Sequence, residues 1–595
     1  MSHIQPPKSD LGTIFVHWLA VAALLGAVIT GLAIAAGDNP WLWAVRYFGF
    51  LLPGENIWIW HLYFGITLLS SILAYAVYVR RTRLAGRIVF DASRFSALLQ
   101  GGRLGWASLN VLLYWVLFLA FAVEICTGVL LFFNFGGVLL RIHLHATWFF
   151  LVFLFLHPCV HWLYGGNGQI ARIFKPQWRL PQRQPELVDA LIERVQALEI
   201  ERTSPAPGNP LAGSRRVEPP QAMTIFAPLA FAITAGAALA PLSTAIEEQT
   251  QQTLRIVRID AADAPSIDGD ISEAVWRRAP AVTALTQHGA NFGGGESTVE
   301  VRAVHDGKFA YFAFNWTDPS RSLKHMPLVK TEDGWHLMRG ETPGNETQFH
   351  EDKFAILLAA GGQHLLGQGF HFGQHPVSDA PAAATGRGLH FLAGGYGDVW
   401  QWRASHGGMS GWIDHAHFGP PLPGSAPQPS GRYAGGFTID PQRLPYQDNF
   451  TDVSSPGAYP RVRPVRFPKN AAAFLKLSWL SLDPDNSAAE TSRFWLSPDE
   501  SEPYSEVIDR AVPAGTVIPS ILFSPEMAKR EDPESVIGNA RWTSGRWSLE
   551  LKRRLDTGAP NDTVIKSGVL MWVAAFDHAE TWHTYHLRPF ELEVE

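Results

Sequence analysis

Long apolar runs occupy only the first part of the chain. Five of them come close to the roughly 20 residues that a helix needs to cross a bilayer, and they cover about 14–36, 57–79, 107–133, 142–164 and 224–245. The fifth run also resembles a signal sequence, because Arg215 and Arg216 precede it, but we interpret it as an uncleaved helix. After about residue 246 no apolar run is long enough to span a membrane. The pattern predicts a multidomain membrane protein whose first part is all-α.

From about residue 256 onward, the apolar residues instead form short runs that are typical of β-strands. Two of these, 298–304 and 308–316, flank Asp306-Gly307, which is a strong signal for a β-hairpin. Further strands are expected at 353–359, 472–480, 547–552 and 569–576, with long glycine- and proline-rich loops at 361–388 and 419–468. This half is therefore predicted to be an all-β sandwich with large insertions.

Residues 181–222 separate the fourth and fifth apolar runs. They include a stretch with the pattern of a short amphipathic helix at 185–201 and a linker rich in proline, glycine and arginine at 204–220. We therefore divide the chain into a helical membrane bundle at 10–180, a cytoplasmic linker at 181–222, a fifth transmembrane helix at 223–245 and a β-sandwich domain at 250–595.

Basic residues predict the orientation in the membrane. The two loops on one side carry only Arg46 and Arg141 as bases, whereas the opposite side is rich in them. Because positive charge stays in the cytoplasm, the N-terminus is expected inside. Five crossings then place the β-sandwich in the periplasm of a bacterium, anchored in its inner membrane. The basic residues of the inner side are Arg80, Arg81, Arg83, Arg87, Arg94, Arg103, Arg172, Lys175, Arg179 and Arg183.

Composition excludes several classes of function. The net charge of -6 argues against a nucleic-acid partner, which would normally meet a basic face. The only cysteines, Cys126 and Cys159, lie in apolar runs, so neither a disulfide framework nor a cysteine-ligated metal site is expected. No Cys-x-x-Cys-His motif is present, which excludes covalent c-type haem attachment.

Four histidines in the apolar runs are the main candidates for function, since polar side chains at membrane depth are costly. His143 and His157 lie fourteen residues apart in the fourth run, so they leave one helix face about 21 Å apart along the axis. By depth, His17 should meet His157 near the inner surface, and His61 should meet His143 near the outer surface. Neutral imidazole is a common axial ligand of haem iron, so this arrangement predicts two bis-histidine haems, held noncovalently.

A structural interpretation of these histidines stays open: each could simply bond a backbone carbonyl or another polar group of the bundle. His145 and His161 lack a partner at the same spacing, so contact with a haem propionate, a quinone or solvent is the better interpretation for both. Cys126, Cys159 and Glu124 are interpreted as packing or pore-lining residues.

Three motifs of the first half resemble the bacterial cytochrome b561 and nickel-hydrogenase cytochrome b subunit family. They are the pair His17-Trp18, the motif His61-x-x-x-Gly65 and the spacing of His143 and His157, and the resemblance covers roughly residues 10–180. It implies a four-helix dihaem bundle that exchanges electrons with quinone.

The second half resembles the haem-binding domain of ethylbenzene dehydrogenase gamma subunits, in order, over most of residues 255–595. That resemblance implies a β-sandwich with one b-type haem held by methionine and lysine, which relays electrons from a periplasmic molybdenum enzyme. The shared motifs are Ile267-Asp268-Gly269 with Trp276, Trp316-Thr317-Asp318-Pro319, Glu351-Asp352-Lys353, Asp398-Val399-Trp400-Gln401-Trp402-Arg403, and Phe576-Asp577 with His586.

The expected haem ligands of this domain differ here. His390 stands where the methionine is expected, and His583 and His586 stand near the lysine position. A third haem between His390 and His583, with His586 as the alternate ligand, is one interpretation; a haem-free recognition domain is the other. Met326, Met409 and Met571 are also kept as alternative haem ligands. The histidine clusters 364/371/375 and 415/417 could bind a metal, although their glycine-rich loops favour adventitious binding.

Together these features predict a quinone-linked membrane cytochrome b with a periplasmic redox partner. It would be the electron-transfer subunit of an oxidoreductase rather than its catalytic subunit, because no nucleophile–base set, phosphate loop or molybdopterin pattern is found. The alternative is a dihaem anchor that carries a haem-free domain for a ligand or carbohydrate. Ile-Asp-Gly openings followed by tryptophan also occur in carbohydrate-binding sandwiches, and a fold does not fix a function.

Overall fold

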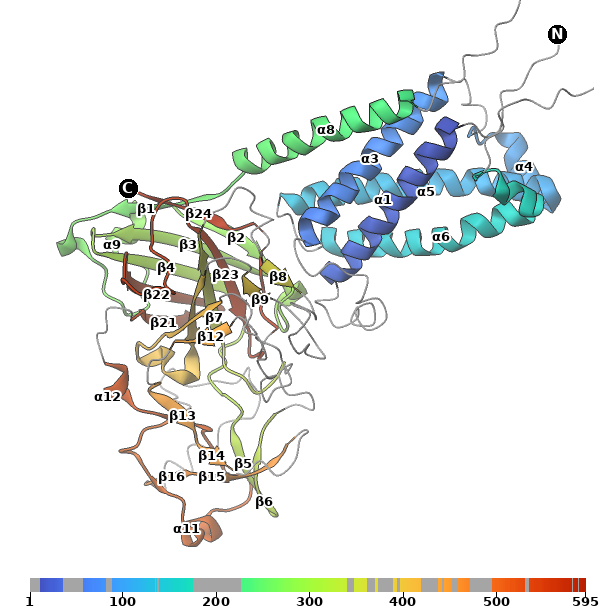
Figure 1. The fold of residues 1–595 in the computed structure, drawn as a ribbon. Coiled ribbons are helices and arrows are strands. Elements are labelled where there is room, and N and C mark those ends of the chain that lie inside the picture. Colours follow the sequence, from blue (N-terminus) through green and yellow to red (C-terminus); the bar gives the residue numbers. More distant parts are fainter. Residues whose placement is uncertain are drawn as a thin grey trace, which may run out of the picture. The chain divides into compact units, whose positions relative to one another are not determined.

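The chain forms two compact units, one helical and one rich in β-strands (Figure 1). The structure is a computed structural model. It describes residues 11–35, 57–81, 88–133, 135, 138–174, 226–339, 347–360, 370–372, 389–392, 396–418, 437–440, 444–451, 459–470, 495–529, 535–580, 582–586 and 588–595.

Four helices in the described part of the chain are long and apolar enough to cross a membrane. Their apolar segments are Ile14–Leu32, Trp60–Val79, Leu104–Phe132 and Val138–Ala171, which confirms the first four predicted runs. The helices are α1 (Leu11–Ala35), α3 (Ile57–Arg81), α5 (Gly102–Phe132) and α6 (Val138–Ala171). The fifth run forms the helix α8 (Phe226–Gln249), whose passage through a membrane stays a prediction.

A short helix, α4 (Ala92–Gln100), forms in the arginine-rich segment that the sequence analysis treated as a loop. Asp91 caps its first turn, because the carboxylate accepts a hydrogen bond from the backbone N–H of Arg94 at 3.0 Å. The predicted helix at 185–201 and the linker at 204–220 lie outside the described residues.

The β-rich unit is built on one twelve-stranded sheet with the order β12-β11-β10-β7-β23-β24-β1-β3-β4-β22-β21, and β2 also pairs with β3. The strands are β1 (Thr253–Arg258), β2 (Val282–Thr286), β3 (Ser297–His305), β4 (Phe309–Thr317), β7 (Lys353–Ala359), β10 (Gly397–Arg403), β11 (Asp414–Phe418), β12 (Phe437–Ile439), β21 (Ile537–Thr543), β22 (Arg546–Arg554), β23 (Leu570–Phe576) and β24 (Phe590–Val594).

The long sheet curls so that its two halves face each other over one core. Strands far apart in its order meet through aromatic rings: Trp316 of β4 stacks on Phe354 of β7 with centroids 4.5 Å apart, and Trp402 of β10 lies 4.8 Å from Trp547 of β22. All four of these rings are fully buried. The arrangement is that of a sandwich whose two layers belong to one continuous sheet.

Strand β24 lies in the middle of this sheet, between β23 and β1. It runs parallel to β1, with Thr253 opposite Glu591, and antiparallel to β23, with Leu570 opposite Glu591. The opening and closing segments of the β-rich sequence therefore pair with each other at the centre of the fold.

Smaller sheets gather at one end of the β-rich unit (Figure 1). Leu328, Trp335, Phe467 and Ile518 form a second, smaller core between them. Their strands are β5 (Leu328–Thr331), β6 (Gly334–Leu337), β13 (Tyr446–Asp448), β14 (Phe450–Thr451), β15 (Arg461–Pro464), β16 (Arg466–Pro468), β17 (Trp495–Leu496), β18 (Ser501–Pro503), β19 (Val517–Ile518) and β20 (Ile521–Phe523). A separate pair is β8 (Phe370–Phe372) with β9 (Leu389–Leu392).

Short helices complete the unit, namely α9, α11, α12 and four single 3-10 turns. Their bounds are η4 (Ala261–Asp263), α9 (Ala274–Arg278), η5 (Gly293–Gly295), η7 (Ala404–His406), η8 (Gly408–Ser410), α11 (Glu506–Ala511) and α12 (Pro525–Ala528).

The predicted strands at 298–304, 308–316, 353–359, 547–552 and 569–576 are confirmed as β3, β4, β7, β22 and β23. The hairpin at Asp306-Gly307 also forms: Gly307 has a φ of 89°, and the Asp306 carboxylate accepts the N–H of Phe309 at 2.7 Å. The strand at 472–480 lies outside the described residues. The loop predicted at 419–468 is wrong in part, because β12 to β16 form there. These strands have two to four residues, too few to show a periodic pattern.

Candidate functional site

The helical unit brings the four predicted histidines together in two pairs. The ring centroids of His17 on α1 and His157 on α6 lie 6.3 Å apart, and those of His61 on α3 and His143 on α6 also lie 6.3 Å apart. An imidazole nitrogen binds a metal at about 2 Å, and the ring centre lies about 1 Å behind that nitrogen, so two rings on one ion have centroids about 6 Å apart. Both pairs therefore fit one metal ion between two imidazoles.

His143 is held by polar groups of the neighbouring helix α5. Its Nδ1 lies 2.6 Å from Oε2 of Glu124 and 2.8 Å from Oγ1 of Thr127. The other oxygen of Glu124 accepts a hydrogen bond from Thr147 on α6 at 3.1 Å. With Nδ1 turned to the carboxylate, Nε2 is the nitrogen left for a metal. A carboxylate behind a ligand histidine fixes its tautomer and orientation.

Glu124 was predicted to be a packing or pore-lining residue, and its contact with His143 was not predicted. The available signal was a carboxylate in a membrane helix, which needs a partner. Sequence alone does not show which of the nearby polar residues that partner is.

His157 has different surroundings. Phe153 stacks on its ring with centroids 5.1 Å apart, and the ring of His161 lies 4.6 Å away. The Nδ1 atom of His157 is buried and has no hydrogen-bond partner among the described residues. His161 instead contacts Tyr114 Oη at 3.1 Å and Gln169 Nε2 at 3.5 Å, one with each ring nitrogen, so it is a poor candidate for a metal ligand.

Two glycines lie on the helices close to His61 and His143. A Cβ added to Gly65, one turn after His61, would meet no atom within 4 Å. A Cβ added to Gly128 would lie 3.4 Å from Cε1 of His143. The missing side chain at Gly65 leaves open space beside His61, and that at Gly128 lets the ring of His143 lie close to α5. With the 6.3 Å separation of the two rings, these residues fit a haem.

The predicted ligands of the β-rich unit are not brought together in the described part of the chain. His390 lies in β9, but its side chain is outside the described residues. His583 packs on Phe576, with centroids 4.9 Å apart. His586 has both nitrogens engaged, because Nε2 accepts from the N–H of Val573 and Nδ1 donates to the carbonyl of Arg588. Burial lowers the pKa of His586 to about 4, so it stays neutral.

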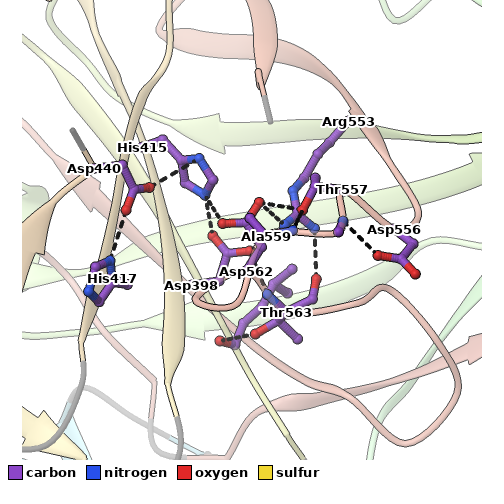
Figure 2. Close-up of polar contacts among 12 residues, drawn as sticks. Asp398, His415, His417, Asp440, Arg553, Asp556, Thr557, Ala559, Asp562 and Thr563 are labelled. Carbon is purple, nitrogen blue, oxygen red and sulfur yellow. Dashed lines mark hydrogen bonds and ion pairs between the residues drawn. The ribbon is translucent and has the colours of Figure 1, made fainter. Parts of the chain in front are cut away.

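The predicted cluster of His415 and His417 belongs to a buried network of charges (Figure 2). His415 Nε2 lies 2.8 Å from Asp398 and 3.5 Å from Asp562, and its Nδ1 lies 3.2 Å from Asp440. The guanidinium of Arg553 joins Asp398 at 2.7 Å and Asp562 at 3.1 Å. Burial disfavours charge on His415, but the three carboxylates outweigh burial and raise its pKa. The network thus places Asp398, Asp440 and Asp562 against one imidazole and one guanidinium inside the β-rich unit.

Comparison with family models shows which protein families the two units resemble. The ethylbenzene dehydrogenase model matches residues 273–588, which is more than half of the sequence. The chain belongs to the ethylbenzene dehydrogenase family. A second model, prokaryotic cytochrome b561, matches residues 8–176. Both resemblances noted in the sequence are therefore confirmed.

The cytochrome b561 match assigns the helical unit as a membrane b-type cytochrome that acts in electron transfer. The ethylbenzene dehydrogenase match covers nearly all of the β-rich unit, including the charged network of His415 and Asp398. No curated protein matches the chain.

Solved structures give only distant likenesses. A family 9 carbohydrate-binding module from Caldicellulosiruptor kristjanssonii in complex with glucose is 7% identical, with 58% of this chain and 96% of that chain covered and a TM-score of 0.20. The same module in complex with cellotriose is 8% identical, with 57% and 93% covered and a TM-score of 0.19. Scores this low carry no argument about what the ethylbenzene dehydrogenase domain of this chain binds.

Proposed function

We propose that the chain carries electrons between membrane quinol and a periplasmic redox partner through two b-type haems, each held by two histidines. His17 and His157 would hold one haem, and His61 and His143 the other. The observation that carries the proposal is the equal 6.3 Å separation of the imidazole rings in the two pairs. A b-type haem supplies one-electron chemistry at an iron atom whose potential depends on its ligands and burial.

The placement of the two pairs supports transfer across the membrane. His143 and His157 lie on one helix, and fourteen residues of helix correspond to about 21 Å, or most of the apolar thickness of a bilayer. One pair would thus lie near each surface. The excess of arginine after α3 and α6 supports a cytoplasmic inner surface, and a fifth crossing by α8 would put the β-rich unit in the periplasm.

The pairing can be tested by counting haems. Single substitutions to alanine at His17, His157, His61 or His143 should each remove one of two b-type haems, as measured by pyridine haemochrome on the full chain in detergent. The double variant of His17 and His157 should lose the same single haem, whereas the double variant of His17 and His143 should lose both.

The control variant is His145→Ala, on the same helix but with an exposed side chain; it should keep both haems. The assignment would be wrong if the His17 and His157 double variant lost both haems while the His17 and His143 double variant lost one.

Haem in the β-rich unit stays a prediction, because the side chain of His390 is outside the described residues. The alternative of a carbohydrate-binding domain would need tryptophans with exposed faces to stack on sugars. Five tryptophans of the β-rich unit are at most 1% exposed and offer no such face: Trp276, Trp316, Trp400, Trp402 and Trp547. Trp276 and the Ile-Asp-Gly motif stabilise the fold. The indole N–H of Trp276 and the backbone N–H groups of Asp268 and Gly269 donate hydrogen bonds to the buried carboxylate of Glu550.

A further inference from the structure

The β-rich unit contains a second histidine cluster, around the carboxylate of Glu351. His325 Nδ1 lies 2.7 Å from Oε2 of Glu351, and His406 Nδ1 lies 2.9 Å from Oε1. The three donor atoms lie within 4.8 Å of one another. Each comes from a different segment: His325 precedes β5, Glu351 precedes β7, and His406 ends η7 after β10. The fold therefore assembles the cluster from residues far apart in the sequence.

The cluster lies inside the protein rather than on a glycine-rich surface loop. Glu351 is 0% exposed, His406 is 4% exposed and His325 is 8% exposed. A third buried ring, that of His350, lies 5.0 Å from His325, and the rings of His325 and His406 are 4.6 Å apart. These separations are too short for a haem between the rings, but they suit imidazoles that bind one side of a small ion.

Glu351 supplies the negative charge of the cluster, and each of its two oxygens faces an imidazole. Arg403 lies 3.1 Å from Glu351 and also 3.7 Å from Asp414, so one guanidinium serves two carboxylates. Carboxylate and imidazole side chains both bind metals in their deprotonated forms.

The backbone next to the cluster is strained. Met326 and Phe349, which adjoin His325 and His350, have φ values of 37° and 61°. The N–H of Met326 donates to the carbonyl of Phe349 at 2.5 Å. Non-glycine residues adopt such values at a cost, and they concentrate where a side chain must be held in place. The two segments that carry His325 and His350 are thus tied together at strained positions.

We propose that His325, Glu351 and His406 bind one divalent transition-metal ion in the β-rich unit. Two imidazoles and one carboxylate form a donor set found for Zn²⁺ and for non-haem Fe²⁺. His350 would complete or line the site. The proposal concerns a site apart from the haem ligands of the helical unit and does not depend on them.

Zinc is the probe for this site. The full chain, produced with added Zn²⁺, purified in detergent and desalted, should retain about one zinc per chain by elemental analysis, as a single-ion site requires. The double variant His325→Ala with His406→Ala should retain at least tenfold less. Zinc, rather than iron, avoids confusion with haem iron.

The matched control is His415→Ala, which removes a buried histidine from the other carboxylate network and should leave the zinc content unchanged. The single variant His406→Gln preserves volume and hydrogen bonding, so it guards against loss of zinc through unfolding; it should lose zinc while its thermal transition matches that of the wild type. Equal zinc in the wild type and the double variant would overturn the proposal, as would zinc loss in His415→Ala to the same extent.

Discussion

Glu124 is a carboxylate in a membrane helix, and its closest partner is an imidazole 2.6 Å away. An acceptor behind a ligand imidazole makes that imidazole more electron-rich, which stabilises the oxidised metal and lowers its potential. Glu124→Gln should therefore raise the midpoint potential of the haem held by His143 by on the order of 60 mV, a tenfold step for a one-electron couple. A potentiometric titration of the haem absorbance measures the shift.

The second haem is the internal control of this titration. In the described residues no carboxylate contacts His157, so the haem held by His17 and His157 should keep its potential. A potential that falls, or two potentials that move together, would contradict the role given to Glu124. Thr147→Val removes the hydrogen bond that Thr147 donates to the other oxygen of Glu124, which leaves the carboxylate a stronger acceptor and should give a smaller shift in the opposite direction.

His415 makes the stability of the β-rich unit depend on pH. Its pKa is raised in the folded state by Asp398, Asp562 and Asp440, so protonated His415 stabilises the fold below its unfolded pKa of about 6.5. That stabilisation is lost as the pH rises through the raised folded value. The melting temperature of His415→Gln should thus change less between about pH 6 and pH 8 than that of the wild type.

His417→Gln is the matched variant for that measurement, because His417 contacts only one carboxylate of the network, Asp440, at 2.8 Å. It should keep more of the pH dependence than His415→Gln. Identical slopes for the wild type and His415→Gln would show that His415 does not couple protonation to folding.

Strands β4 and β22 carry two tryptophans that pair directly, Trp316 and Trp547. Both are fully buried, but the indole N–H of Trp547 donates to Asp352 at 3.1 Å, whereas that of Trp316 has no partner among the described residues. Substitution by phenylalanine removes a similar volume at each site. Trp547→Phe should therefore cost about 1 kcal/mol more than Trp316→Phe, because it removes one of the two hydrogen bonds to this oxygen of Asp352, the other being donated by the N–H of Ser322.

The measurement is the free energy of unfolding of the β-rich unit in the full chain, from denaturant titration of the two variants side by side. An equal loss in both would mean that packing alone determines the contribution of these tryptophans.

Elements with a strong periodic pattern could be predicted from the sequence, and short ones could not. The four long apolar runs became α1, α3, α5 and α6, and the hairpin at Asp306-Gly307 is present. The strands of two to four residues in 419–468 depend on distant partners, such as Trp335 of β6 for Val462 of β15. No local signal distinguishes such strands from loop, because tertiary pairing rather than propensity forms them.

At the scale of the whole molecule, the spacing of His143 and His157, together with the depth of His17 and His61 in their helices, predicted the two pairs of rings that lie close together in the helical unit. The cluster around Glu351 could not be predicted in that way, because the three donor residues come from separate segments that only the folded sheet brings together. Glu351 itself stood in a recognised family motif, yet nothing in the sequence connects it to His325 or His406. Spacing and depth along long helices predict a site between those helices, but no comparable signal predicts one assembled from separate segments of a sheet.

The position of β24 also affects how the protein is made. The central sheet needs β24 between β23 and β1, although β1 is synthesised first and β24 last among the strands. Domains usually fold as units as they emerge from the ribosome. Here β1 and β23 cannot complete their pairing until β24 has been translated. A nascent chain stopped before Phe590 would have an open gap at its centre, with two unpaired strand edges. The central sheet can therefore be completed only after this strand has been translated.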